Sequence, residues 1–150
     1  MQCILFVCHG NICRSTMAEY IMRHLIRERG LEHRISADSA AATRDALGMT
    51  PHPGTRDVLA RHGIACGNHR ARKLTRADYE RYDLIVGMDS ENLRDIRRIL
   101  RSDPQHKVHL LLDWTDHPRE VADPWYTDDY DTTFADVWTG CSYLLDALEG

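Results

Sequence analysis

The chain has 150 residues, which is the size of one domain, so we expect residues 1–150 to fold as a single unit. Hydrophobic residues make up 43% and charged residues 28% of it, which excludes disorder or a coiled coil as a description of the whole chain. The formal net charge of -4 argues against a nucleic-acid partner. No apolar run approaches the roughly 18 residues of a membrane helix, and the N-terminus lacks the basic segment of a signal peptide, so we expect no membrane partner.

Five cysteines cannot all pair within the chain, and three of them, Cys3, Cys8 and Cys13, lie near the N-terminus. A secreted disulfide scaffold is shorter and richer in cysteine. We therefore expect reduced thiols and a cytoplasmic location. We expect Cys3, Cys66 and Cys141 to fill the core.

The N-terminal segment predicts a strand, a tight loop and a helix. Residues 3–7 form a continuous apolar run, as in a buried strand of a parallel sheet. Residues 8–15 contain glycine and polar side chains, which indicates a loop. Apolar residues then recur at helical spacing from 17 to 26, and Gly30 ends this helix.

The rest of the chain continues the alternation of strands and helices. Further strands are expected at 35–39, 83–88 and 108–112. Further helices are expected at 55–62, after a capping box at 75–78, at 90–100 and at 130–148. Loops are expected at 40–53 and 113–129. This order predicts an α/β fold with a doubly wound sheet of about four parallel strands, helices on both faces and a phosphate-binding loop after the first strand.

The loop at 8–15 carries the residues with catalytic potential. Ligands of such folds bind at the carboxyl ends of strands, and this loop leads into a helix N-terminus, where free N–H groups favour an anion. Gly10 and Asn11 tolerate the dihedral angles of a loop that curls around a ligand. Arg14 offers a planar fork of donors for a phosphate. In that field Cys8 is favoured as a thiolate, and therefore as a nucleophile.

Two other interpretations of this loop are open from the residues alone. Cys8 could be a core residue at a strand end, with Arg14 a solvated residue at a helix start. A metal site could use Cys3, Cys8, His9 and Cys13, but these lack the Cys-x2-Cys spacing of zinc sites. Cys3 and Cys8 would also point to opposite faces of the strand. We therefore expect no metal ligands.

Residues 7–19, Val-Cys-His-Gly-Asn-Ile-Cys-Arg-Ser-Thr-Met-Ala-Glu, closely resemble the signature of the low-molecular-weight protein tyrosine phosphatases. The resemblance continues through Asp38-Ser39-Ala40, His69-Arg70-Ala71-Arg72, Met88-Asp89, Asn92-Leu93-Arg94-Asp95 and Asp123-Pro124-Trp125-Tyr126. It implies an enzyme that hydrolyses phosphotyrosine, an aryl phosphate monoester, through a cysteinyl-phosphate intermediate without a cofactor or metal. The implied partners are a phosphotyrosine protein or peptide and inorganic phosphate, as product and inhibitor.

Such a reaction needs an acid, because protonating the leaving phenol, with a pKa near 10, is worth roughly 10²–10⁴ in rate. Asp123 is the best candidate, since Pro124 biases it to an extended conformation and stiffens its loop. The resemblance points to the same residue. Asp123 can then act as the base for the water that hydrolyses the intermediate. We expect Asp128, Asp129 and Asp131 to cap the last helix and complement its dipole instead.

The resemblance also implies supporting roles. The remaining members of the phosphate-binding loop are His9, Gly10, Asn11, Ile12, Cys13 and Ser15. Asn11, Ser39 and His69 correspond to a network that holds the loop and Ser15, whose hydroxyl would help the thiolate to leave. From the residues alone, His69 beside the basic run 70–73 would be a surface histidine next to a solvated face.

Trp125 and Tyr126 resemble the aromatic wall that flanks the substrate ring in the family; they could otherwise pack under the last helix. In the family, the pair that corresponds to Cys8 and Cys13 can form a protective disulfide. A nearby thiol can trap the sulfenic acid of an oxidised thiolate, so Cys13 is a candidate redox partner. Cys13 could also simply pack inward.

Three positions depart from the family pattern. His9 stands where the family often has an apolar or small residue. Thr16 replaces a proline at the helix start, where we expect little effect. The loop at 44–46 lacks an aromatic that many members place opposite the Asp-Pro loop, so we expect a more open or more polar substrate slot.

Two rival functions are consistent with a Cys-x5-Arg loop on this fold. An arsenate reductase would need a further cysteine after the third strand, and residues 88–101 contain none. An inactive module that binds a phosphorylated ligand would be expected to lack Cys8, Arg14 or the acid, and all three are present. The sequence therefore favours a protein tyrosine phosphatase.

Overall fold

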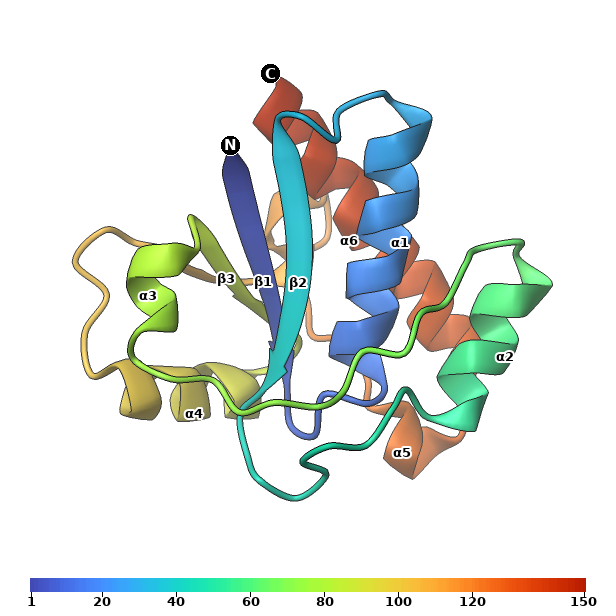
Figure 1. Ribbon diagram of the computed structural model, residues 1–150, viewed down its shortest axis with the longest axis horizontal. Coiled ribbons are helices and arrows are strands. Elements are labelled where there is room, and N and C mark those ends of the chain that lie inside the picture. The colour runs from blue at the N-terminus through green and yellow to red at the C-terminus, as the bar shows by residue number, and fades with distance from the viewer.

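The computed structural model describes residues 1–150. Strands and helices alternate along the chain (Figure 1). The strands are β1 (Gln2–Cys8), β2 (Ile35–Ala41), β3 (Leu84–Gly87) and β4 (Val108–Leu110). The helices are α1 (Arg14–Glu28), α2 (Pro53–Arg61), α3 (Asp78–Arg81), α4 (Ser90–Leu100), the 3-10 helix η1 (Leu111–Trp114), α5 (Pro124–Thr127) and α6 (Tyr130–Glu149). None of these helices combines the length and apolarity needed to cross a membrane.

All four strands are parallel, and their order in the sheet is β2-β1-β3-β4. The predicted doubly wound α/β sheet is therefore confirmed. The chain moves outward from β1 to β2 and then crosses to β3 on the other side of β1. The carboxyl end of β1 is thus the point where the strand order reverses, and ligands of such folds bind there.

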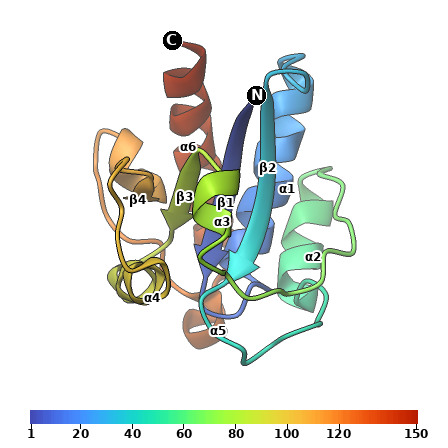
Figure 2. The same cartoon turned by 60° about the vertical axis from the view of Figure 1, so that its left-hand side comes forward.

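Alternate side chains of β1 enter two separate cores. Ile4 and Phe6 pack with α1 and α6 on one face of the sheet, whereas Leu5 and Val7 pack with α4 on the other. Figure 2 shows these helices on opposite sides of the sheet. All four residues are fully buried. Burial on both faces is why the strand is a continuous apolar run.

The prediction of a strand at 108–112 is correct at its start and wrong at its end. β4 ends at Leu110, and Leu111 and Leu112 begin η1. These two leucines are fully buried in the core beneath α6. Gly140 of α6 permits the close approach, since a Cβ atom there would lie 2.5 Å from Leu111 Cγ. A run of leucines satisfies the apolar pattern of a strand and of a buried turn equally well.

The other cysteines and the basic run also differ from expectation. Cys141 is fully buried in the larger core, as predicted, and Cys66 packs against its edge. Cys3 is half-buried and lies outside both cores, so that prediction is wrong. The solvated face expected at 70–73 is wrong in part, because Arg72 Nη1 lies 3.1 Å from a carboxylate oxygen of the buried Asp78.

The expected loop at 113–129 contains the four-residue helix α5. One of the two hydrogen bonds of the predicted capping box is present: the Asp78 carboxylate accepts from the Thr75 N–H over 2.8 Å.

Candidate active site

Cys8 is the last residue of β1, and the loop from His9 to Cys13 connects it to α1. The loop curls because Asn11 adopts a left-handed conformation with φ of 60°. It is fixed from outside by neighbouring segments: the Cys8 carbonyl accepts from the Ala42 N–H, and the Ile12 carbonyl accepts from the His52 N–H. The N–H groups of residues 10–13 donate to no other group of the chain. Unpaired N–H groups of this kind at a helix N-terminus are available to an anion.

The Cys8 side chain is only 3% exposed and lies directly against Ser15. Cys8 Sγ lies 3.1 Å from Ser15 Oγ, and the Ser15 N–H donates to Sγ over 3.4 Å. Asn11 Nδ2 donates to Ser15 Oγ over 2.8 Å. Because the Asn11 amide already supplies a proton to that oxygen, the Ser15 hydroxyl proton is free to point at the sulfur. The Ser15 N–H and hydroxyl are thus placed as two donors to the sulfur.

His69 holds Asn11 in place. His69 Nε2 lies 2.8 Å from Asn11 Oδ1 and must be the donor, since an amide oxygen only accepts. His69 Nδ1 lies 3.6 Å from Glu19 Oε1, and the Ser39 hydroxyl donates to the same oxygen over 2.5 Å. The structure thus joins the three predicted supporting residues into one network.

Glu19, which connects two of these residues, was missed by the sequence analysis. It follows Ser15 by one helical turn and is 1% exposed. Burial raises the pKa of the Glu19 carboxyl and lowers the pKa of the His69 imidazole. A charged residue on the apolar side of the first helix was the signal that could have identified it.

Arg14 is the first residue of α1 and is 2% exposed. Its Nη1 donates to Asp89 Oδ2 over 2.7 Å and to the Val121 carbonyl over 2.9 Å. Asp89 caps α4 with its other oxygen, which accepts from the Asn92 N–H over 2.7 Å. The sequence analysis gave Asp89 no role. These contacts orient the guanidinium while its buried Nε is left without a partner inside the protein, so this donor is available to an anion in the pocket.

Asp123 lies across the pocket from the loop and caps α5. Its Oδ1 accepts from the Trp125 N–H over 3.0 Å, and its Oδ2 lies 3.3 Å from Arg14 Nη2. The backbone of Asp123 is extended, as Pro124 predicted. The other candidate acids lie elsewhere: Asp129 caps α6, Asp131 binds Arg61, and Asp128 does not line the pocket.

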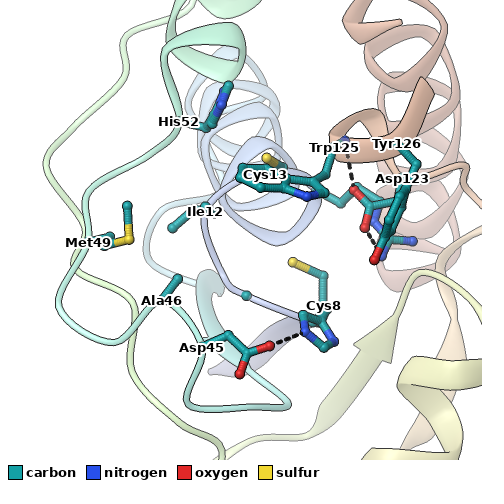
Figure 3. Close-up of a pocket in the computed structure, with 13 residues that line it drawn as sticks. Cys8, Ile12, Cys13, Asp45, Ala46, Met49, His52, Asp123, Trp125 and Tyr126 are labelled. Carbon is teal, nitrogen blue, oxygen red and sulfur yellow. Dashed lines mark hydrogen bonds and ion pairs between the residues drawn. The ribbon is translucent and has the colours of Figure 1, made fainter. Parts of the chain in front are cut away.

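A pocket of about 290 Å³ collects these side chains (Figure 3). Cys8 lies near its middle, with Asp123 and Tyr126 on one side and Met49 on the other. The predicted residues that line it are Cys8, His9, Gly10, Ile12, Cys13, Arg14, Asp123, Trp125 and Tyr126. The additional residues are Asp45, Ala46, Met49 and His52. The predicted residues Asn11, Ser15, Ser39 and His69 lie behind this wall and hold it.

The rim is built from exposed side chains. Trp125 is 62% and Tyr126 is 84% exposed, so neither packs under the last helix. His52, which the sequence analysis missed, meets the Trp125 ring edge-on with 5.8 Å between centroids. His9 Nε2 lies 2.7 Å from Asp45 Oδ2. A polar pair thus lies in the loop that the sequence analysis identified as lacking an aromatic residue. The slot is polar there, as the sequence predicted.

Cys13 lies in the same pocket as Cys8, and both are free thiols. Cys13 Sγ lies 3.8 Å from the Tyr130 hydroxyl. Burial is the main cause that raises the pKa of Cys13 to about 12, so its thiol is neutral at physiological pH. Tyr130 in turn stacks on His52 and fits against the Cα of Gly54, where a side chain would collide with its ring.

Comparison with known proteins shows similarity to one family along nearly the whole chain. The family model for low molecular weight phosphotyrosine protein phosphatase matches residues 3–150. The low molecular weight protein-tyrosine-phosphatase YfkJ of Bacillus subtilis is 38% identical over 151 residues, which cover 99% of this chain and 97% of that protein. The crystal structure of YfkJ matches with a TM-score of 0.95 and covers 99% of this chain and 95% of that chain.

Two further relatives place this match in context. The human low molecular weight phosphotyrosine protein phosphatase is 35% identical over 141 residues, which cover 92% of this chain and 87% of that protein. A Drosophila arginine phosphatase, DARP, has a TM-score of 0.89 at 27% identity and covers 100% of this chain and 99% of that chain. The fold is thus shared by proteins named for different phosphorylated substrates, while the sequence identity to the two tyrosine phosphatases, 38% and 35%, exceeds the 27% identity to the arginine phosphatase. The chain belongs to the low molecular weight phosphotyrosine protein phosphatase family.

Proposed function

We propose that this chain hydrolyses phosphotyrosine with Cys8 as the nucleophile, Arg14 as the phosphate-binding residue and Asp123 as the general acid and base. The observation that carries the proposal is the convergence of these three side chains on one pocket, although Arg14 and Asp123 are 109 residues apart in sequence. A surface arginine or a simple Asp-Pro turn would not explain that convergence.

In the first step, the Cys8 thiolate attacks phosphorus and the bond from phosphorus to the phenolic oxygen breaks. Asp123 donates its proton to that oxygen, so tyrosine leaves as a neutral phenol and a cysteinyl phosphate is formed. Arg14 Nε and the free N–H groups of residues 10–13 bind the equatorial oxygens, where charge develops. No bond to a metal is required for this step.

In the second step, the Asp123 carboxylate takes a proton from water as the water attacks phosphorus. The bond from sulfur to phosphorus breaks, and inorganic phosphate leaves with Cys8 restored as a thiolate. Ser15, 3.1 Å from Sγ, donates to the departing sulfur. The acid of the first step thereby becomes the base of the second.

The depth of the pocket favours an aryl ester over the short side chain of phosphoserine. Cys8 is 3% exposed, whereas Trp125 is 62% exposed at the rim, so a long side chain is needed to bring phosphorus to sulfur. The ring of phosphotyrosine would also stack on Trp125. The protein substrates are phosphotyrosine proteins or peptides, and inorganic phosphate is the product and a competitive inhibitor.

The test is a steady-state assay on matched peptides that carry phosphotyrosine, phosphoserine, phosphothreonine or phosphoarginine at one position. We expect hydrolysis of the phosphotyrosine peptide and little of the others. Arsenate reduction with a thiol donor is the parallel assay for the rival function. Preferential turnover of phosphoarginine, or reduction of arsenate without ester hydrolysis, would contradict the proposal.

Cys13 is proposed as the residue that protects Cys8 from oxidation. Peroxide would convert the Cys8 thiolate to a sulfenic acid, and the Cys13 thiol would displace water to form a disulfide. This role requires a reducing compartment such as the cytoplasm to restore the thiols. A thiol reductant should restore activity after brief peroxide treatment more completely in the wild type than in Cys13→Ser, because an unprotected Cys8 would be oxidised further to sulfinic acid. Equal recovery of the two proteins would show that Cys13 only fills space.

A further inference from the structure

A second hollow of about 540 Å³ adjoins the catalytic pocket. Ile12, Met49 and His52 line both hollows and form the wall between them. The second hollow contains two charged side chains, Arg56 of α2 and Arg70, and no acidic one. We name it the arginine groove.

The two arginines are oriented by backbone carbonyls and carry uncompensated charge. Arg70 Nη1 donates to the Gly48 carbonyl over 2.9 Å, and Arg56 Nε donates to the Pro51 carbonyl over 3.2 Å. Arg56 also donates from Nη2 to Asn68 Oδ1 over 3.0 Å and from Nη1 to Cys66 Sγ over 3.8 Å, so it contributes its charge to the groove while Arg70 keeps free donors. Both acceptors belong to the segment before α2 that lines the groove. Neither arginine forms an ion pair, whereas Arg61, further along α2, has two carboxylate partners. The groove is therefore electropositive and has fixed donors.

Another part of the pocket rim has the opposite charge. Asp45 Oδ2 lies 2.7 Å from His9 Nε2, and Glu91 Oε1 lies 4.0 Å from His9 Nδ1. The mouth of the pocket is thus positive beyond Met49 and His52 and negative beside His9. A charged peptide would be oriented by this asymmetry.

We propose that the arginine groove binds acidic residues that flank the phosphotyrosine of a peptide substrate. This inference rests on the proposed function and specifies its substrate class. Successive residues of an extended peptide are about 3.3–3.6 Å apart, so a residue close to the phosphotyrosine can cross the shared wall. Its carboxylate would then meet the Arg70 guanidinium, whose fork of donors matches its geometry, in the positive field to which Arg56 adds.

The test uses phosphotyrosine peptides of one length with neutral, aspartate or lysine residues on the N-terminal or the C-terminal side. We expect kcat/KM for the best aspartate peptide to exceed that of the neutral peptide by about three- to tenfold, as one or two exposed ion pairs can supply. The preference should fall as salt is raised. Arg70→Glu should abolish this preference and favour lysine on the same side.

Arg34→Glu is the matched control, because Arg34 is exposed, makes no side-chain contact of this kind and precedes β2 at the opposite end of the sheet. It makes the same charge change and should leave the preference intact. Equal effects of the two variants, or a wild type that hydrolyses neutral and aspartate peptides equally well, would overturn the inference. Failure of the proposed function looks different, since the wild type would then hydrolyse neither these peptides nor phenyl phosphate.

Discussion

At the floor of the pocket, Asn11 and Ser15 are completely buried and each hydrogen-bonds to other buried groups. At the rim, Trp125 and Tyr126 expose 62% and 84% of their surface, and Asp45 is attached through one exposed histidine. The floor is held by contacts from α1, β2 and the segment around His69. The rim residues are held mainly by contacts within the short segments to which they belong.

This difference separates chemistry from selectivity. A buried donor or acceptor that loses its partner costs about 1–3 kcal/mol, so the floor tolerates little change. An exposed ion pair contributes only about 0–1 kcal/mol, so the rim can change without loss of the fold. We therefore expect substitutions at the floor to alter the reaction rate and those at the rim to alter the choice of substrate.

The largest effect is expected for Cys8→Ser at the floor. It should reduce hydrolysis of p-nitrophenyl phosphate to background, because a serine hydroxyl is not ionised in this field. Thermal unfolding should show that the variant remains folded. Cys66→Ser, outside the pocket, is the matched control and should keep wild-type turnover. Substantial activity of Cys8→Ser would assign the nucleophile to another residue.

Asp123→Asn should lower kcat by roughly 10²–10⁴ for phenyl phosphate, whose leaving group needs a proton. The loss should shrink for p-nitrophenyl phosphate, whose leaving group needs less assistance. Asp129→Asn keeps a good helix cap and should retain both activities. A loss that does not depend on the leaving group would instead indicate a structural role for Asp123.

Two substitutions of Asn11 separate the contribution of its side-chain hydrogen bonds from the contribution of its backbone conformation. Asn11→Gly tolerates the φ of 60° but removes the amide, so we expect a stability loss of about 1–3 kcal/mol and a lower kcat. Asn11→Ala adds left-handed strain of about 1–2 kcal/mol. Urea unfolding of both variants measures the difference. If Asn11→Gly were as stable and active as the wild type, the buried network would not support the loop.

Trp125→Ala tests the rim. Loss of ring stacking, worth about 0.5–1.5 kcal/mol, should raise the KM for an aryl phosphate by roughly two- to twelvefold. Inhibition by inorganic phosphate, which has no ring to stack, should not change. If phosphate and the aryl ester weakened equally, the Trp125 side chain would act on the shape of the pocket and not on the substrate ring.

The smallest effect is expected for Asp45→Asn, which removes an exposed charge pair with His9. Stability should change by less than about 1 kcal/mol, and turnover of phenyl phosphate by about twofold at most. Urea unfolding and steady-state kinetics measure both. A loss as large as that of Asn11→Gly would mean that the rim is held as firmly as the floor.

The sequence by itself determined the parts of the site that are local. Apolar residues 3–7, a glycine-containing loop and a helix at 3.6-residue spacing place Cys8 and Arg14 at one strand end, because local periodicity fixes these elements. Asp123 could be identified because Pro124 restricts its backbone. Leu111 and Leu112 show the limit of this reasoning, since a short apolar run does not distinguish a strand from a buried turn.

Only the tertiary structure decided which distant residues complete the site. Asp89 reaches Arg14 because β3 lies next to β1, and neither residue carries a local signal of this pairing. Glu19 lies beside Ser39 because α1 packs against β2, and His52 meets Trp125 because α2 and α5 adjoin the same pocket. Such contacts depend on strand order and helix packing, which are set by the burial of both cores together rather than by the sequence around any one residue.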